Sequence, residues 1–234
     1  AARWMQLRIQ AYVESLCPDC QHWISRQLKP VWENKELWKH VHVELFAFGN
    51  AAYVQGNLTC QHGPRECDGN LAIACAQSVL PRDTFFEYIF CFMPLLPNVE
   101  DAATAVVGCL KPPEAQLVAE CRGNKVGHQL IVQAAEKTKA SLQTYTPWVT
   151  VHEVHATTAE QNLKQYICDH LEPGEKTVLC GTSSLVRNVI PLKGSGEYVL
   201  PCQRRMPIGE LEPQYWSGIE AATVRLEVPP EGLM

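Results

Sequence analysis

The residues most able to carry chemistry in this chain are two cysteines separated by two residues, Cys17 and Cys20. They follow a run of alternating apolar and polar residues at 7–15 and precede a helical pattern at 21–28. A cysteine at the start of a helix has its thiolate stabilised by free backbone N–H groups and by the helix dipole. A cysteine one turn further on can attack a mixed disulfide and release the product. The motif therefore predicts thiol–disulfide exchange, with Cys17 as nucleophile and Cys20 as resolving thiol. A zinc knuckle or a structural pair is the alternative.

A second group of candidate ligands lies further along the chain, where Cys60, Cys67 and Cys75 accompany His62. Such a set could bind zinc. Its spacing, C-x6-C-x7-C, lacks the paired C-x2–4-C geometry that closes most tetrahedral zinc sites. We therefore expect these cysteines to form structural disulfides, and we expect no bound metal.

The elements that must position these residues show two kinds of pattern. Alternation of apolar and polar residues predicts strands near 7–14 and 40–47, joined by a helix. Two strands linked in this way by a helix form a βαβ unit and run parallel. Short β runs near 148–152 and 153–156 predict two further strands. Helical patterns separated by Pro and Gly predict a mostly α-helical insertion over about 55–140.

Composition bounds the class of protein. The 234 residues carry a net charge of −5, with Lys and Arg scattered, which argues against nucleic acid or an anionic membrane as partner. The most apolar stretch, 85–96, contains Glu87 and is far shorter than the roughly 20 apolar residues that span a membrane, so we expect no membrane span. Eleven cysteines and the sequon Asn57-Leu58-Thr59 favour an oxidising lumenal or secreted environment, with Asn57 as a glycosylation site.

The segment 60–75 resembles, position by position, the signature C-Q-H-G-x-x-E-C-x-x-N-x-x-x-x-C of the gamma-interferon-inducible lysosomal thiol reductase (GILT) family. The matching residues are Cys60, Gln61, His62, Gly63, Glu66, Cys67, Asn70 and Cys75. The resemblance covers about residues 7–180 and includes the segments 14–20, 48–50 and 145–149.

The resemblance implies an α/β, thioredoxin-like fold with a large α-helical insertion. Thioredoxin-like folds place a cis proline opposite the nucleophilic cysteine, directly before a core strand. Thr146-Pro147 precedes the strand expected at 148–152. Pro147 is therefore the candidate to position the substrate strand.

The resemblance has two limits along the chain. At 152–155 the sequence His-Glu-Val-His stands where the family tends to carry an Asn-Gly or Asp-Gly turn, so we expect an altered hairpin there. Residues beyond about 182 match nothing in the family. We predict a thiol reductase domain over 1–182, which contains the insertion, and a C-terminal tail of unknown role over 183–234.

By resemblance, the protein is a thiol reductase of an acidic endomembrane lumen such as the lysosome, or is secreted. Its partners would be disulfide-bonded protein substrates and a small-thiol or dithiol reductant, with no metal or organic cofactor required. The residues leave two rivals open. One is a disulfide oxidase or isomerase, because direction depends on a reduction potential that a sequence does not report. The other is a non-catalytic, disulfide-stapled lumenal binding protein.

The cysteines outside the C-x-x-C motif are expected to form four disulfides. Nine remain, an odd number, and Cys202 in the unmatched tail is assigned as the unpaired one. We favour Cys168–Cys180, because the chain turns back between them, and Cys109–Cys121, which would join two consecutive helices. The C-x-x-C pair is expected to be the more exposed and more easily reduced one. The eight bridging cysteines are Cys60, Cys67, Cys75, Cys91, Cys109, Cys121, Cys168 and Cys180.

Overall fold

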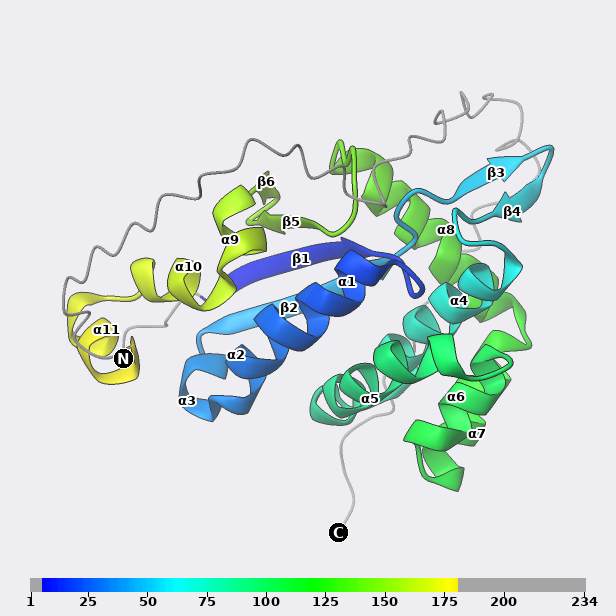
Figure 1. Ribbon diagram of the computed structural model, residues 1–234, viewed down its shortest axis with the longest axis horizontal. Coiled ribbons are helices and arrows are strands. Elements are labelled where there is room, and N and C mark those ends of the chain that lie inside the picture. The colour runs from blue at the N-terminus through cyan, green and yellow to red at the C-terminus, as the bar shows by residue number, and fades with distance from the viewer. Residues whose placement is uncertain (1–5, 181–234) are drawn as a thin grey trace, which may run out of the picture.

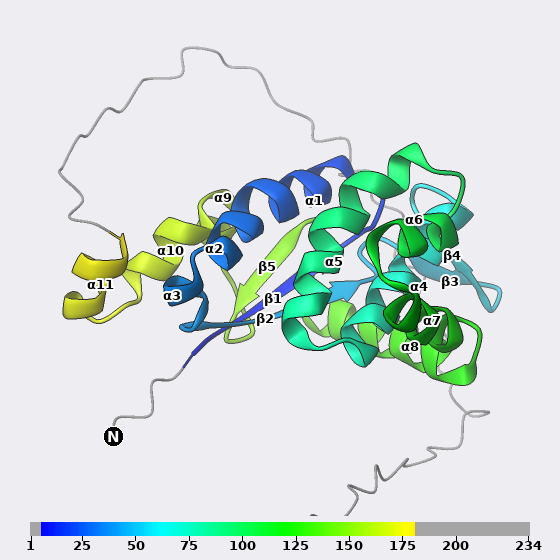
Figure 2. The ribbon, with the colours of Figure 1, turned by 90° about the horizontal axis from the view of Figure 1, so that it is seen from below.

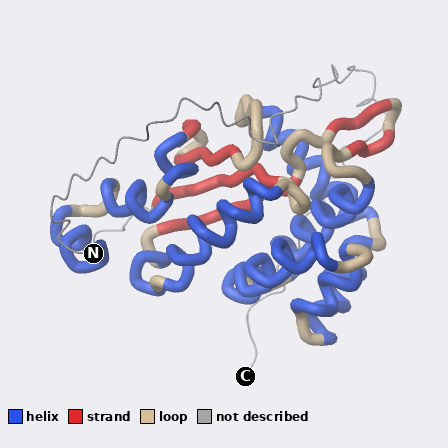
Figure 3. The backbone as a smooth tube through the Cα atoms, viewed as in Figure 1, coloured by secondary structure: helices blue, strands red, loops and turns tan. Residues whose placement is uncertain are grey.

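A four-stranded sheet lies at the core of the protein, whose computed structural model describes residues 6–180 (Figures 1 and 3). The strand order is β2-β1-β5-β6. β1 pairs with β2 in parallel and with β5 antiparallel, and β6 pairs antiparallel with β5. The four predicted strands and the parallel pairing of the first two are confirmed. Their bounds are β1 Leu7–Val13, β2 Val41–Ala47, β5 Trp148–Val151 and β6 Val154–His155.

β1 lies between β2 and β5, and its side chains from Ile9 onward are buried on both faces of the sheet. Ile9, Ala11 and Val13 are fully buried on one face. On the other face Gln10 is buried, and its side-chain carbonyl accepts a hydrogen bond from Thr150 Oγ1 of β5 at 3.3 Å. β2 instead alternates buried and more exposed residues, the pattern that revealed it in the sequence.

The chain leaves β1 into a helical segment that runs through Pro30 and does not stop before it. A proline removes one N–H from the helical ladder, and a π-helical turn directly before it changes the ladder locally. In that turn the Lys29 N–H donates to the carbonyl of Ile24, five residues back. Figure 2 shows α1 and α2 along one face of the sheet. The segment comprises α1 Pro18–Trp23, the π turn Ile24–Leu28, α2 Lys29–Glu33 and α3 Lys35–Trp38.

The predicted insertion is a lobe of helices that packs beside β2 and extends beyond the end of the sheet at which β1 runs into α1 (Figures 1 and 2). α4 packs against all four other helices of the lobe and against β2, so it joins the lobe to the sheet. Phe86, Tyr88 and Phe92 of α5 are fully buried, and Phe86 packs against Trp38 of α3. The helices are α4 Pro64–Val79, α5 Arg82–Leu95 with the 3₁₀ turn Leu96–Asn98, α6 Ala102–Cys109, α7 Pro112–Arg122 and α8 Lys125–Ala140.

The insertion is not wholly helical, because a two-stranded hairpin precedes α4. β3 Ala52–Val54 and β4 Asn57–Thr59 pair antiparallel across Gln55 and Gly56, which both have positive φ, 50° and 79°. Such strands, only three residues each, are too short for alternation to reveal them. Asn57, the predicted glycosylation site, is exposed at the start of β4.

Four disulfides join cysteines of residues 6–180: Cys60–Cys67, Cys75–Cys121, Cys91–Cys109 and Cys168–Cys180. The eight cysteines expected to form bridges do so, and Cys168–Cys180 agrees with the prediction. The predicted pairing of Cys109 with Cys121 is wrong. α6 packs against both α5 and α7, and its Cys109 bonds to Cys91 of α5, whereas Cys121 of α7 bonds to Cys75 of α4, the helix against which α7 packs most closely. Cys202 and the predicted tail 183–234 lie outside the described residues.

The peptide bond Thr146–Pro147 is cis and directly precedes β5, in agreement with the prediction. Between β5 and β6, His152 and Glu153 adopt positive φ values of 49° and 67°, the left-handed conformations that an Asn-Gly turn favours. A two-residue turn therefore forms here with His152 and Glu153 in place of Asn-Gly, and the expected alteration of the hairpin is not found. The sheet, the cis proline and the helical lobe form the predicted thioredoxin-like fold with an insertion. The described chain ends with α9 Thr157–Gln161, α10 Leu163–Asp169 and α11 Pro173–Cys180.

Within residues 6–180, each helix is too short or too polar to cross a lipid bilayer.

Candidate active site

Cys17 and Cys20 lie at the junction between β1 and α1. Cys17 is the residue before the first helical turn, and its Sγ accepts a hydrogen bond from the backbone N–H of Cys20 at 3.3 Å. Cys20 Sγ in turn accepts a hydrogen bond from the backbone N–H of Glu14 at 3.4 Å. The two sulfur atoms are not bridged to each other. Cys17 thus occupies the helix start at which free N–H groups and the dipole stabilise a thiolate.

Both cysteines are fully buried, contrary to the expectation of an exposed pair. The loop that carries them is tied down against α4. The Ser15 N–H donates to Asn70 Oδ1 at 2.8 Å, and Ser15 Oγ donates to the carbonyl of Glu66 at 3.0 Å. A Cβ at Gly69 would lie 2.4 Å from Ser15 Oγ, so this close approach requires glycine. A substrate disulfide can reach Cys17 only if its neighbours move.

The cis-proline segment closes on Cys17 from a distant part of the chain. Thr146 Oγ1 lies 3.5 Å from Cys17 Sγ. Pro147, the third residue predicted to be catalytic, follows directly. The structure therefore brings the three predicted residues into one region.

Glu160 of α9 fixes the backbone around Pro147. Its Oε1 accepts a hydrogen bond from the Val149 N–H at 2.9 Å, and its Oε2 accepts one from the Tyr145 hydroxyl at 2.8 Å. These bonds hold the chain on both sides of the proline.

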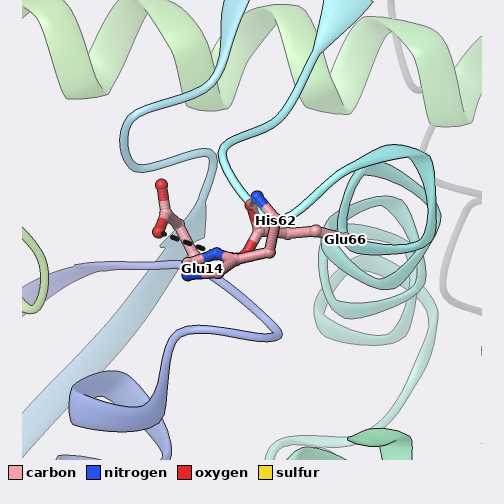
Figure 4. Close-up of side chains that lie close together, drawn as sticks. All are labelled: Glu14, His62 and Glu66. Carbon is pink, nitrogen blue, oxygen red and sulfur yellow. Dashed lines mark hydrogen bonds and ion pairs between the residues drawn. The ribbon is translucent and has the colours of Figure 1, made fainter. Parts of the chain in front are cut away.

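Glu14, at the end of β1, places a fully buried carboxyl group beside the cysteines. Its Oε1 accepts a hydrogen bond from the Asn50 N–H at 2.6 Å, while its Oε2 lies 3.4 Å from Thr146 Oγ1 and 3.8 Å from His62 Nδ1. The ring Nδ1 of His62 also lies 2.5 Å from Glu66 Oε2. The backbone N–H of His62 donates to Glu66 Oε1 at 3.0 Å. Figure 4 shows these three titratable side chains converging from β1, from the loop before α4 and from α4.

Side-chain amides link this cluster to the cis-proline segment. Asn50 Nδ2 donates to Gln61 Oε1 at 2.6 Å, and Asn50 Oδ1 accepts from Gln143 Nε2 at 3.0 Å. The Cys60–Cys67 disulfide closes the loop that carries Gln61. The 60–75 signature therefore supports the site directly.

Gly49 allows Glu14 to occupy its position. Its φ is +55°, and a Cβ at Gly49 would lie 2.3 Å from Glu14 Cγ. Both the conformation and the space exclude a larger residue.

Comparison with known proteins identifies the family of this chain. Residues 8–113 match the family model described as "Gamma interferon inducible lysosomal thiol reductase (GILT)". The chain is 30% identical over 186 residues to the gamma-interferon-inducible lysosomal thiol reductase of Mus musculus, which covers 75% of this chain and 72% of that protein. It is 34% identical over 184 residues to the protein of the same name from Carassius auratus, with 74% and 71% covered. The chain belongs to the GILT family.

Two solved structures are also similar to this GILT-family chain. Oxidised BdbD from Bacillus subtilis has a TM-score of 0.49 at 14% identity, with 69% of this chain and 85% of that chain covered. MdbA from Corynebacterium diphtheriae, a thiol-disulfide oxidoreductase, has a TM-score of 0.48 at 13% identity, with 71% and 86% covered. As a member of the GILT family, the protein is a thiol–disulfide oxidoreductase.

Burial dominates the electrostatics of the GILT-family site. It raises the pKa of Glu14 to about 9, and the nearby Glu66 carboxyl adds to this increase. Burial also raises the pKa of Glu66, although His62 opposes the shift. The pKa of the Cys20 thiol is raised well above its ordinary value, first by burial and then by its hydrogen bond with Cys17. Glu14 therefore keeps its proton through acidic and neutral pH.

Glu14, His62 and Glu66 place three potential metal-ligand atoms within 4.8 Å of one another. His62 Nδ1 is already within hydrogen-bond distance of Glu66. In this structure the three side chains form a cluster in which His62 pairs with Glu66 and lies beside Glu14.

The sequence predicted the cysteines, Pro147 and the 60–75 signature, but it missed Glu14 and Thr146 as site residues. Glu14 did give a signal, because a glutamate that ends a buried strand must find partners. Thr146 gave none beyond its place before the proline.

Proposed function

We propose that the protein reduces disulfides of protein substrates through Cys17 and Cys20. The Cys17 thiolate attacks one sulfur of the substrate disulfide and expels the other as a thiolate, which takes up a proton. Cys20 then loses its proton and attacks Cys17 Sγ, which releases the second substrate thiol and leaves a Cys17–Cys20 disulfide. The substrate gains the two electrons that the cysteines lose. A small-thiol or dithiol reductant then supplies two electrons to the Cys17–Cys20 disulfide and regenerates both thiols.

The observation that carries this proposal is the position of Cys17 Sγ at the N-terminus of α1, against Thr146. The helix start favours the thiolate over the thiol. Cys20 is one turn away, near enough for its N–H to bind the same sulfur, which supports its role as the resolving thiol. Pro147, beside Thr146, is proposed to position the substrate strand.

We further propose that the protein acts in an acidic endomembrane lumen, such as the lysosome, or outside the cell. The names of the relatives support the lysosome. Disulfides persist in oxidising compartments, and the exposed Asn57 sequon supports glycosylation there. We assign reductase activity to residues 1–182, with 183–234 as a separate tail.

Insulin reduction at acidic and neutral pH, driven by a small thiol, tests the proposal. All variants carry Cys202→Ser, which removes the cysteine outside the described residues. We expect activity from the parent protein and from a chain truncated after residue 182, and none from Cys17→Ser. Cys20→Ser should accumulate mixed disulfides with substrate on non-reducing gels, because the resolving thiol is gone.

Equal adduct levels from Cys17→Ser and Cys20→Ser would overturn the roles given to the two thiols. A parent protein that forms disulfides in reduced insulin chains in a glutathione buffer, and fails to reduce them, would be an oxidase. Loss of activity on truncation alone would show that the tail belongs to the reductase unit.

A further inference from the structure

The hydroxyl of Thr146 faces two acceptors but can satisfy only one of them. Its Oγ1 lies 3.4 Å from Glu14 Oε2 and 3.5 Å from Cys17 Sγ. A threonine hydroxyl has a single proton to donate and lone pairs with which to accept. One of the two neighbours must therefore receive that proton while the other does not.

The protonation state of Glu14 decides between the two acceptors. An ionised carboxylate binds a donor more strongly than a neutral group does, so it draws the hydroxyl proton away from the sulfur. A protonated Glu14 reverses the arrangement, because its own O–H can donate to Thr146 Oγ1. The hydroxyl proton is then available to Cys17 Sγ, where it stabilises a thiolate.

The existing hydrogen bonds of Glu14 leave its Oε2 available to carry the proton that is donated to Thr146. Oε1 already accepts from the backbone N–H of Asn50 at 2.6 Å, so a proton on the carboxyl is best placed on Oε2. Oε2 is the atom that faces Thr146.

The groups around Glu14 offer little positive charge to hold it ionised. The titratable groups that face it are Cys17 and Cys20 from the start of α1, His62 from the loop before α4, and Glu66 from α4. The Gly49–Asn50 loop and the cis-proline segment present an amide and a hydroxyl, which carry no charge. His62, the basic member of this set, lies 2.5 Å from Glu66 and 3.8 Å from Glu14, so it pairs mainly with Glu66.

We propose that Glu14 and Thr146 form a proton switch that stabilises the Cys17 thiolate while Glu14 is protonated and withdraws that support when Glu14 ionises. Switching releases one proton from Glu14 to solvent and rotates one hydroxyl, and no bond between heavy atoms changes. The Glu66 carboxyl favours a neutral Glu14, and His62 pairs with Glu66. The inference rests on the proposed role of Cys17 as nucleophile and adds the way in which a neutral Glu14 would support its thiolate.

The test measures the ionisation of Cys17 directly in a Cys20→Ser, Cys202→Ser background. The rate of alkylation of Cys17 by iodoacetamide, located by peptide mapping, is followed against pH. The ultraviolet absorbance of the thiolate gives the same curve without a reagent that must reach a buried sulfur. Thr146→Val removes the hydroxyl at nearly constant volume, Thr146→Ser keeps it, and Glu14→Gln supplies a neutral side chain of the same length.

Thr146→Val should move the midpoint of the Cys17 curve to higher pH by about one unit, the equivalent of one hydrogen bond to a charged group. Thr146→Ser should restore the midpoint. The background protein should also show a second, alkaline rise in alkylation rate of about threefold, since a thiolate that loses its donor becomes more basic and more nucleophilic. Glu14→Gln should lack that second rise.

An unchanged midpoint in Thr146→Val, a Thr146→Ser curve that matches Thr146→Val, or a second rise that persists in Glu14→Gln would each refute the switch. Insulin reduction by the unsubstituted protein is measured alongside. If that protein reduces insulin through Cys17 while the curves do not differ, the switch fails and the proposed function stands. If it does not reduce insulin, the proposed function fails, and the curves still decide whether Glu14 controls the sulfur.

Discussion

Replacing Gly49 by alanine tests how tightly the buried carboxyl of Glu14 is held. An alanine at φ +55° loses about 1–2 kcal/mol of folding free energy because its Cβ crowds the backbone in the left-handed region. Its Cβ would also lie 2.3 Å from Glu14 Cγ and 2.7 Å from Glu14 Oε1, and forcing extra volume into a packed site costs about 1–3 kcal/mol. We therefore expect Gly49→Ala to lower the free energy of unfolding by about 2–5 kcal/mol. The variant should also reduce insulin more slowly, because the added Cβ displaces the Glu14 carboxyl from the backbone N–H of Asn50.

A double-mutant cycle with Glu14→Ala separates the two contributions. The backbone cost of Gly49→Ala remains in the Glu14→Ala background, but the clash disappears with the atoms that cause it. Urea unfolding of the four proteins should give a coupling free energy of about 1–3 kcal/mol between the sites. A coupling within about 0.5 kcal/mol of zero would refute the close packing of Gly49 on Glu14.

Three further predictions concern stability. Folding raises the pKa of Glu14 from 4.5 to about 9, so the stability that the protonated carboxyl contributes is complete below pH 4.5 and lost as the pH rises through about 9. In urea unfolding at several pH values, Glu14→Gln should show a smaller loss of stability with rising pH than the parent protein. An equal loss in both proteins would contradict the shift. Replacing both cysteines of Cys75–Cys121 by alanine should lower the free energy of unfolding by about 4 kcal/mol, and the same change at Cys168–Cys180 by about 3 kcal/mol. The difference arises because the first disulfide closes a loop of 46 residues and the second a loop of 12. The opposite order in chemical unfolding would count against chain entropy as the cause. Glu153→Gly should raise the free energy of unfolding by about 1 kcal/mol, because Glu153 has a φ of 67° and its ion pair with Arg8 is largely exposed; a loss of stability would show that the pair outweighs the turn.

The sheet was predictable because its strands carry local signals. Alternation along β2 and the apolar run of β5 located both, and the βα connection at Cys17 fixed the parallel direction of the first pair. The hairpin β3–β4 gave no signal, because its strands are three residues long. The helix that continues through Pro30 depends on a π turn whose hydrogen bonds no composition rule reveals.

The contacts of the site depend on long-range packing that a sequence does not display. Cys109 bonds to Cys91 because α5 and α6 pack together, whereas proximity along the chain favoured Cys121. Glu14 meets His62 because α4 lies at the end of the sheet, and the 60–75 signature alone did not say what His62 would touch. The burial of Cys17 likewise follows from the way Ser15 is tied to α4.

The disulfides of the helical lobe set a limit on the conditions in which this protein can work. Cys60–Cys67 closes the loop that carries His62, and Cys75–Cys121 fastens α4, the helix that carries Glu66, to α7. A thiol–disulfide oxidoreductase thus depends on its own disulfides for the geometry that surrounds its C-x-x-C cysteines. A reductant strong enough to open these bridges would keep Cys17 and Cys20 reduced. It would at the same time break the disulfides that hold the His62 loop and α4 in place.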